Sequence, residues 1–191
     1  MTSRKEQAER SRSRLVEAAL HLFVEQGYEA TSISQVLAAT GMAKGALYHH
    51  FPEGKRELFG EAVEIADHPF HEGLDVIVAT VASPVERITA GWKLVLDLAT
   101  DPVFAKIVLV EAQAVAPEAW TGAGQFQLLR ATLEEAIAAG EIRPMPLDAA
   151  AATLFGAIRR MADYVAVADD PAQAARDGDA VLHALVAGLR A

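Results

Sequence analysis

The chain has 191 residues, of which 52% are hydrophobic, and it contains no cysteine. This length allows one compact domain or a small domain joined to a larger one, and the composition excludes a globally disordered chain. The lack of cysteine excludes disulfides, thiolate metal sites and a cysteine nucleophile. No apolar run is long enough to span a bilayer, and the first 14 residues are polar and charged, unlike a signal peptide. We therefore expect a cytoplasmic protein with no membrane partner.

The net charge of −9 is unevenly distributed along the chain. Residues 1–60 carry eight Lys or Arg and seven acidic residues, a net charge of +1, whereas the remainder carries −10. Residues 1–14 alone reach +3. Because the Debye length at physiological salt is about 8 Å, a ligand at the N-terminal surface senses mainly the local charge. The overall acidity therefore does not exclude a polyanionic partner.

Helical periodicity begins with an apolar stripe that predicts a first helix. The stripe consists of Leu15, Ala18, Ala19, Leu22 and Phe23. Gly27 is expected to end this helix. Ser32 and Gln35 form a capping box at the start of a short helix that Gly41 breaks.

A second short helix is predicted over residues 43–50. Leu47 and Phe51 lie one turn apart and are expected to point into the core. Pro52 disfavours helical geometry at Phe51, so the helix should stop there.

The rest of the chain is also predicted to be helical, with caps and prolines marking the boundaries. A long helix begins near Lys55, and Pro69 should kink or split it. Ser83 and Glu86 predict a second capping box. Three aspartates are expected to cap later helices: Asp101, Asp148 and Asp170. Because no alternating β pattern or hairpin turn is present, we predict an all-α fold.

The stretch 31–56 has the spacing of a helix-turn-helix, in which two short helices flank a four-residue turn around Gly41. In such a unit the second helix enters the major groove of DNA and its first residues contact base edges. The candidate contacts on that helix are the cation Lys44, the small residues Gly45 and Ala46, and the hydrogen-bonding residues Tyr48 and His49. The capped helix start at Thr31 and Ser32 is a candidate phosphate site, as is Lys55.

The first helix together with GYEATSISQVLAATGMAKGALYHHFPEGKREL resembles the DNA-binding domain of the TetR (tetracycline-repressor) family of bacterial regulators. The core signature is G-x-x-K-G-x-L-Y-x-H-F, and the resemblance covers residues 10–65, with a GEIRP phrase at 140–144 beyond it. It implies a three-helix helix-turn-helix domain, residues 1–55, followed by a larger helical ligand-binding and dimerisation domain, residues 56–191. Members of the family are typically homodimers that an inducer releases from operator DNA.

The signature also assigns roles to individual positions. The positions that match DNA-facing ones are Lys44, Ala46, Tyr48 and His49. The positions that match phosphate-binding ones are Thr31, Ser32 and Lys55. Two departures occur: Ala43 stands where a capping residue is frequent, and FPEGK is one residue longer than the common form, so that Gly54 occupies the lysine position in the simpler alignment.

The C-terminal helices contain large side chains that could line a ligand pocket or belong to the core. They are Trp92, Phe104, Trp120, Phe126, Phe155, Met161 and Tyr164. Because few basic residues lie in this acidic region, we expect an apolar or cationic ligand rather than a strongly anionic one.

The last two helices have apolar faces broader than one intrachain contact requires, which favours a two-fold interface between copies. The expected interface residues are Leu154, Ile158, Val165, Leu182, Leu185 and Leu189. Such an interface would space two helix-turn-helix units about one DNA turn, or a multiple of it, apart on a palindromic site.

The sequence therefore predicts a transcriptional repressor that binds double-stranded operator DNA as a homodimer and is released by a small-molecule effector. We expect no catalysis, no metal and no cofactor. One alternative is a helical metal-dependent enzyme that uses Glu64, His68 and His71, although Pro69 disturbs the helix between the histidines. Another is an adaptor that kept the fold and lost DNA binding.

The sequence also leaves open the role of three arginines near the N-terminus. Arg10, Arg12 and Arg14 form either an ordinary solvated face or an arm that contacts DNA.

Overall fold

The computed structural model describes residues 4–115 and 122–190, which form α-helices, one π-helical segment and no β-strand. The all-α prediction is confirmed. The elements are α1 (Arg4–Ala30), α2 (Ile33–Thr40), α3 (Lys44–His50), α4 (Lys55–Thr80), α5 (Pro84–Leu98), η1 (Phe104–Glu111), α6 (Ala112–Val115), α7 (Ala123–Ala138), α8 (Leu147–Ala166) and α9 (Pro171–Ala187).

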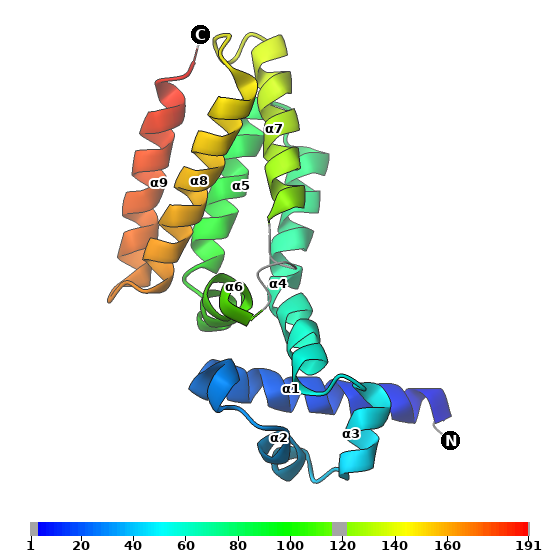
Figure 1. Ribbon diagram of the computed structural model, residues 1–191. Coiled ribbons are helices and arrows are strands. Elements are labelled where there is room, and N and C mark those ends of the chain that lie inside the picture. The colour runs from blue at the N-terminus through cyan, green and yellow to red at the C-terminus, as the bar shows by residue number, and fades with distance from the viewer. Residues whose placement is uncertain (1–3, 116–121, 191) are drawn as a thin grey trace.

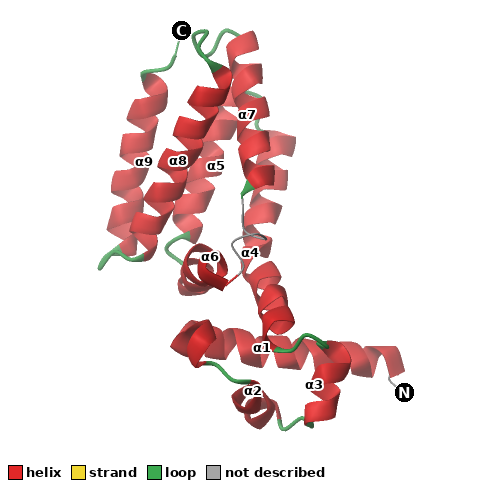
Figure 2. Cartoon of the chain, in the orientation of Figure 1, coloured by secondary structure: helices red, strands yellow, loops and turns green. Residues whose placement is uncertain are grey.

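The helices form two groups, which we call the head (α1 to α3) and the body (α5 to α9 with η1). Figure 1 shows α1 lying across the base of the molecule, with α2 and α3 beneath it and the body helices standing above. Helix α4 begins in the head and continues alongside the body (Figure 1). Short loops join most of these helices (Figure 2).

Local signals in the sequence explain the head. Helix α1 is interrupted at Gly27, where φ is 83° and ψ is 167°. The predicted capping box forms, since the Ser32 side chain accepts a hydrogen bond from the Gln35 N–H and the Gln35 side chain accepts one from the Ser32 N–H. Gly41 ends α2 with a positive φ of 67°, the conformation that glycine adopts most readily. The chain is thereby turned so that α3 can begin at Lys44.

The core of the head is built from the inward faces predicted by the helical period. Leu15, Phe23, Leu47 and Phe51 are all fully buried. Phe59 of α4 packs edge-on against Phe23, with ring centroids 5.2 Å apart. The first turns of α4 therefore complete the core of the head.

Two features of α4 and α5 bear on the sequence predictions. Pro69 lies inside α4, so of the predicted kink or split the split does not occur. The Ser83 hydroxyl accepts a hydrogen bond from the Glu86 N–H as predicted, but a distant residue completes this end of α5. Glu141 accepts from the Ser83 hydroxyl at 2.7 Å and from the Val85 N–H at 3.0 Å, and both bonds lower the pKa of Glu141.

The segment after α5 is capped as expected but is not an α-helix. Asp101 accepts hydrogen bonds from the N–H groups of Val103 and Phe104, each at 2.9 Å. The helix that follows, η1, has π-helical hydrogen bonding, a rare form that occurs often at functional sites. The hydrophobic period does not distinguish the two helix types.

The aspartate caps of the last two helices differ in outcome. Asp170 caps α9, because its side chain accepts from the Gln173 N–H at 2.9 Å. Asp148 does not cap α8, which begins one residue earlier at Leu147. The Asp148 carboxylate instead pairs with Arg130 of α7 at 2.7 Å. None of the helices within the described residues is both apolar and long enough to cross a membrane.

Candidate functional site

Helix α3 presents a compact set of polar and small residues on the outside of the head. Lys44, Gly45 and His49 are exposed, and Tyr48 is 41% exposed, whereas Leu47 between them is fully buried. The Lys44 ammonium lies 5.8 Å from the centroid of the Tyr48 ring. As predicted, Ala43 gives α3 no side-chain cap, so its first N–H groups keep their donor capacity. A cation and free donors thus meet at the tip of this helix.

Gly45 is notable because nothing in the described protein requires a glycine there. A Cβ atom at Gly45 would meet no atom within 4 Å. Its φ is also not positive, so the backbone conformation suits any residue. The space in front of Gly45 is open to a partner that approaches the backbone closely.

The three residues expected to bind phosphate have different surroundings. Ser32 is exposed at the start of α2. Thr31 is only 1% exposed, and its hydroxyl donates to the Gly27 carbonyl at 2.8 Å, so its side chain supports the end of α1 and is not available to a phosphate. The Lys55 ammonium donates to the Tyr28 carbonyl at 2.9 Å and lies 4.0 Å from the centroid of the Tyr28 ring. Lys55 therefore joins α4 to α1 in this structure.

Two of the N-terminal arginines also make contacts within the head. Arg12 pairs with Glu61 of α4, which raises its pKa, and lies 5.2 Å from the centroid of the Phe51 ring. Arg14 donates to the Thr40 carbonyl at the end of α2 at 2.8 Å. Both lie on helix α1, where Arg12 is partly buried and Arg14 is exposed. Arg10 remains exposed on the same helix.

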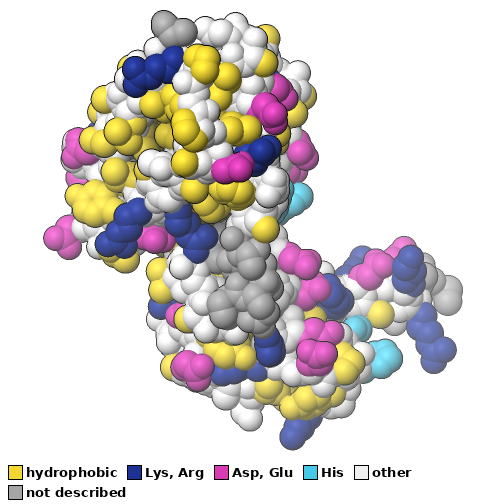
Figure 3. All heavy atoms as spheres, turned by 45° about the horizontal axis from the view of Figure 1, so that its top comes forward, with side chains coloured by type: hydrophobic (Ala, Val, Ile, Leu, Met, Phe, Trp, Pro, Cys, Tyr) yellow, Lys and Arg dark blue, Asp and Glu magenta, His cyan; other side chains and the backbone are white. Residues whose placement is uncertain are grey.

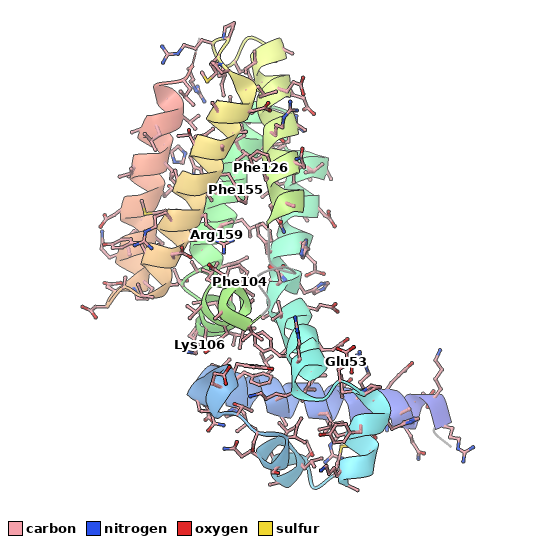
Figure 4. All side chains as sticks on the ribbon, in the orientation of Figure 1. Glu53, Phe104, Lys106, Phe126, Phe155 and Arg159 are labelled. Atoms are coloured by element: carbon pink, nitrogen blue, oxygen red, sulfur yellow. The ribbon has the colours of Figure 1, made fainter. Side chains whose placement is uncertain are left out.

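The body contains a largely apolar pocket between α4, α5, η1, α7 and α8, with a cavity volume of about 140 Å³. Its described lining is Phe70, Leu74, Ile77, Val78, Arg87, Ile88, Gly91, Trp92, Val95, Phe104, Leu109, Gly122, Gln125, Leu128, Leu129, Thr132, Phe155, Ile158, Arg159 and Ala162. Figure 4 shows Phe104, Phe155 and Arg159 on elements that surround this space.

The pocket contains part of the predicted aromatic set. Trp92, Phe104 and Phe155 line it. Phe126 instead packs edge-on behind Phe155, with ring centroids 5.7 Å apart. The other three predicted residues have other surroundings. Met161 packs near Gly178 of α9, Tyr164 is 53% exposed, and Trp120 lies outside the described residues.

The charge of the pocket is opposite to the charge of the body. Among its described lining residues the only charged side chains are Arg87 and Arg159. The expectation of an apolar or cationic ligand rested on the acidity of the whole region, whereas the charged side chains that line this cavity are basic. Sequence reasoning missed both arginines, because Arg87 follows a helix cap and Arg159 neighbours Arg160, positions typical of a solvated helix face.

Several predicted interface residues belong to the core of a single copy. Leu154, Val165 and Leu182 are at most 4% exposed, because α8 and α9 pack on each other, and Ile158 lines the pocket. Leu185 is 48% exposed, whereas Leu189 is partly buried. The large exposed apolar residues here are Tyr164 of α8, Val167 directly after α8, and Val181 and Leu185 of α9. Figure 3 shows hydrophobic side chains gathered over one side of the body.

The residues of the metal hypothesis pair separately. His68 lies 3.2 Å from Glu72, and His71 lies 3.0 Å from Asp67. Within residues 4–115 and 122–190, no group of three His, Asp or Glu side chains comes close enough to hold a metal ion. The structure therefore does not support the metal-enzyme alternative.

Comparison with known families matches both parts of the chain. Residues 15–62 match the model for bacterial regulatory proteins of the tetR family, and residues 85–189 match the tetracyclin repressor-like C-terminal domain. The transcriptional regulator YxaF of Bacillus subtilis (strain 168) is 40% identical over 92 residues, which cover 46% of this chain and 44% of YxaF. The transcriptional repressor AcnR of Corynebacterium glutamicum is 31% identical over 117 residues, which cover 57% of this chain and 61% of AcnR. The chain spans about half the length of the curated relatives it matches.

A solved structure extends the similarity over the whole chain. A TetR-family transcriptional regulator from Pectobacterium atrosepticum is 27% identical, with a TM-score of 0.78, and the match covers 99% of this chain and 98% of that one. The N-terminal and C-terminal family matches thus lie in one chain that is similar over its whole length to a known regulator. From the two family matches together, the chain belongs to the tetR family of bacterial regulatory proteins.

Proposed function

We propose that this protein is a ligand-responsive transcriptional repressor that binds a palindromic operator through α3 and is released by an effector in the body pocket. The observation that carries the proposal is the outer face of α3, where Lys44, Tyr48 and His49 are exposed around a glycine that the fold itself does not require. The DNA-contacting residues proposed are Ser32, Lys44, Gly45, Ala46, Tyr48 and His49. We propose residues 1–55 as the DNA-binding domain and 56–191 as the effector and dimerisation domain.

The backbone of α3 supports this role as well as its side chains. An uncapped helix start offers N–H donors and the positive end of the helix dipole, both of which favour a phosphate. The net charge of +1 over residues 1–60 permits approach to DNA, while the −10 of the remainder is repelled by it. The adaptor alternative rested on the missing cap at Ala43 and on the longer 52–55 loop, and the missing cap leaves these donors available.

We further propose a homodimer formed by α8 and α9. Four large apolar side chains on or directly beside these helices are between 48% and 73% exposed, and pairing with a second copy would remove them from water: Tyr164, Val167, Val181 and Leu185. A two-fold axis would present two α3 helices to the two halves of a palindrome. Light scattering of the full chain tests this: Leu185→Glu should give a monomer, whereas Val76→Glu, at a residue of α4 that is 60% exposed, should not.

The proposed function is tested by fluorescence anisotropy with the DNA upstream of the protein's own gene, measured over a series of salt concentrations. Lys44→Ala should weaken specific binding by about 1–3 kcal/mol if the lysine contacts a base, or mainly reduce the salt slope if it contacts a phosphate. Lys93→Ala is the matched control, because Lys93 lies on α5 and pairs with Asp97 at 2.6 Å. Absence of specific binding by the folded protein at every salt concentration would refute the proposal.

A further inference from the structure

The pocket offers charged groups of one kind only. Arg87 of α5 and Arg159 of α8 are the charged side chains in the described lining, and the remaining polar side chains, Gln125 and Thr132, are neutral. An arginine has five N–H donors, no acceptor and a permanent positive charge. The polar part of a bound molecule must therefore supply acceptors, and an ammonium group would be repelled from this lining.

Arg87 also has a donor that the protein leaves unused. Its guanidinium pairs on one side with Glu135 of α7. Its Nε atom is buried and has no hydrogen-bond partner among the described residues. A buried donor without an acceptor is costly, and an acceptor on a bound molecule would remove that cost.

The rest of the lining is suited to an apolar body. Trp92 and Phe104 are buried against the pocket, with exposures of 1% and 4%, and Phe155 lies opposite on α8. The Trp92 indole N–H already donates to Asp179 at 3.0 Å, on the α9 side. Trp92 therefore contributes an apolar surface to the pocket, and its polar atom is engaged elsewhere.

We propose that the effector is an apolar carboxylate, whose hydrocarbon part packs on the aromatic side chains and whose carboxylate is bound by the arginines. This inference rests on the proposed function, because it names the chemical class of the effector of the same pocket. Carboxylate oxygens match the guanidinium fork and bind it more strongly than a neutral acceptor does. The class is set by the pocket lining and is independent of the net negative charge of the body.

The test uses three probes with the same hydrocarbon chain: decanoate, methyl decanoate and decylamine. Isothermal titration into the full chain, without DNA, measures their dissociation constants. We expect the dissociation constant of decanoate to be lower than that of methyl decanoate by a factor of about ten or more. Decylamine should bind least tightly of the three. Equal binding of decanoate and decylamine would overturn the proposal, and so would preferential binding of the neutral ester, because the arginines would then have no preference for an anion.

Three variants assign the effect to the pocket. Arg87→Met and Arg159→Met should each remove most of the preference for decanoate over the ester, because the loss of a positive charge weakens carboxylate binding more than ester binding. Arg130→Met is the matched control, because Arg130 on α7 pairs with Asp148 and Glu134 and does not line the pocket. If Arg87→Met unfolds the protein because Glu135 loses its partner, Arg159→Met decides. A preference for decanoate that survives Arg159→Met, or that Arg130→Met abolishes, would overturn the proposal.

DNA binding is measured separately, in the absence of any probe. Loss of specific DNA binding by the unliganded protein would refute the proposed repressor function but would not change the order of the three probes. A protein that binds its operator but prefers decylamine would keep the proposed function and lose the inference about the effector. The two failures are therefore distinguishable.

Discussion

Helix α3 presents Lys44, Tyr48 and His49 to solvent within two turns of one helix. The body instead places Arg87 and Arg159 in a pocket that is lined by five helices. In the head, the residues available to a partner are neighbours in the sequence. In the body, Arg87 and Arg159 are 72 positions apart and only tertiary packing brings them to one cavity. The position of side chains on one short helix therefore depends on local sequence signals, whereas the lining of a pocket depends on the packing of the whole helical bundle.

The sharpest way to separate the two regions is to remove a core residue of the head alone. Phe51 is fully buried beneath α3, so Phe51→Ala should lower the free energy of unfolding by about 3–5 kcal/mol. Urea unfolding measures the change, and Tyr48→Ala, at an exposed position on α3, is the control for stability. Operator binding should be lost while decanoate binding by the body persists. Loss of both activities together would show that the head and body fold as one unit.

Gly27 tests the junction where the head meets the body. Its φ of 83° and ψ of 167° lie in a region that is essentially restricted to glycine, and a Cβ atom there would lie 2.8 Å from the Glu111 carboxylate of η1. Gly27→Ala should therefore cost about 2 kcal/mol of stability. Gly60→Ala, in regular helix with open space around it, should be neutral or slightly stabilising. Equal melting temperatures for the two variants would contradict this account of Gly27.

Asp67 lies on the part of α4 that follows the head and precedes the pocket. One of its carboxyl oxygens, Oδ2, is hydrogen-bonded to His71 Nε2 at 3.0 Å. The other, Oδ1, is buried without a partner among the described residues. Burial raises the pKa of Asp67 above 3.8, against the opposing effect of His71. The folded state therefore retains this proton more strongly than the unfolded chain, and the stability from this group falls as pH rises from 3.8 through the raised pKa.

Asp67→Asn should accordingly raise stability by about 1 kcal/mol at neutral pH, because a buried carboxylate with one unsatisfied oxygen is replaced by a neutral group. It should also remove the fall in stability above pH 3.8. Thermal melts over a pH series measure both effects, with Glu64→Gln at an exposed position of α4 as the control. A loss of stability in Asp67→Asn at neutral pH would instead indicate that the ionised pair with His71 stabilises the fold.

The smallest expected change in stability comes from Gly45. Because a Cβ atom there meets nothing, Gly45→Ala should leave the fold intact and stabilise it by about 0.5 kcal/mol. The same methyl group would stand between the α3 backbone and DNA, so operator affinity should fall even though stability rises. Unchanged affinity in the anisotropy assay would mean that DNA does not approach this part of the helix.

Much of the head could be predicted because its determinants are local. The Ser32–Gln35 capping box, the turn at Gly41 and the uncapped start at Ala43 all occur where the sequence predicts them. Thr31 could not be assigned correctly in this way. Its position in the motif suggests a phosphate contact, but the break at Gly27 turns its hydroxyl inward.

The body was predictable in its helices and much less so in its pocket and faces. The helical period marks both Leu182 and Leu185 as apolar, yet only packing determines that one is 1% and the other 48% exposed. Tyr164 and Phe155 lie on the same helix, and only Phe155 reaches the pocket. Sequence spacing gives the direction of a side chain relative to its own helix, whereas the pocket depends on how the helices are rotated against one another.

The continuity of α4 through Pro69 has a mechanical consequence. Its 26 residues, at about 1.5 Å per residue, make a lever roughly 39 Å long that starts in the head and lines the pocket through Phe70, Leu74, Ile77 and Val78. A tilt of about 5° would move the far end of such a rod by roughly 3 Å, close to the rise of one DNA base pair. An angular change of a few degrees beside the pocket is therefore enough to shift the head by one base step.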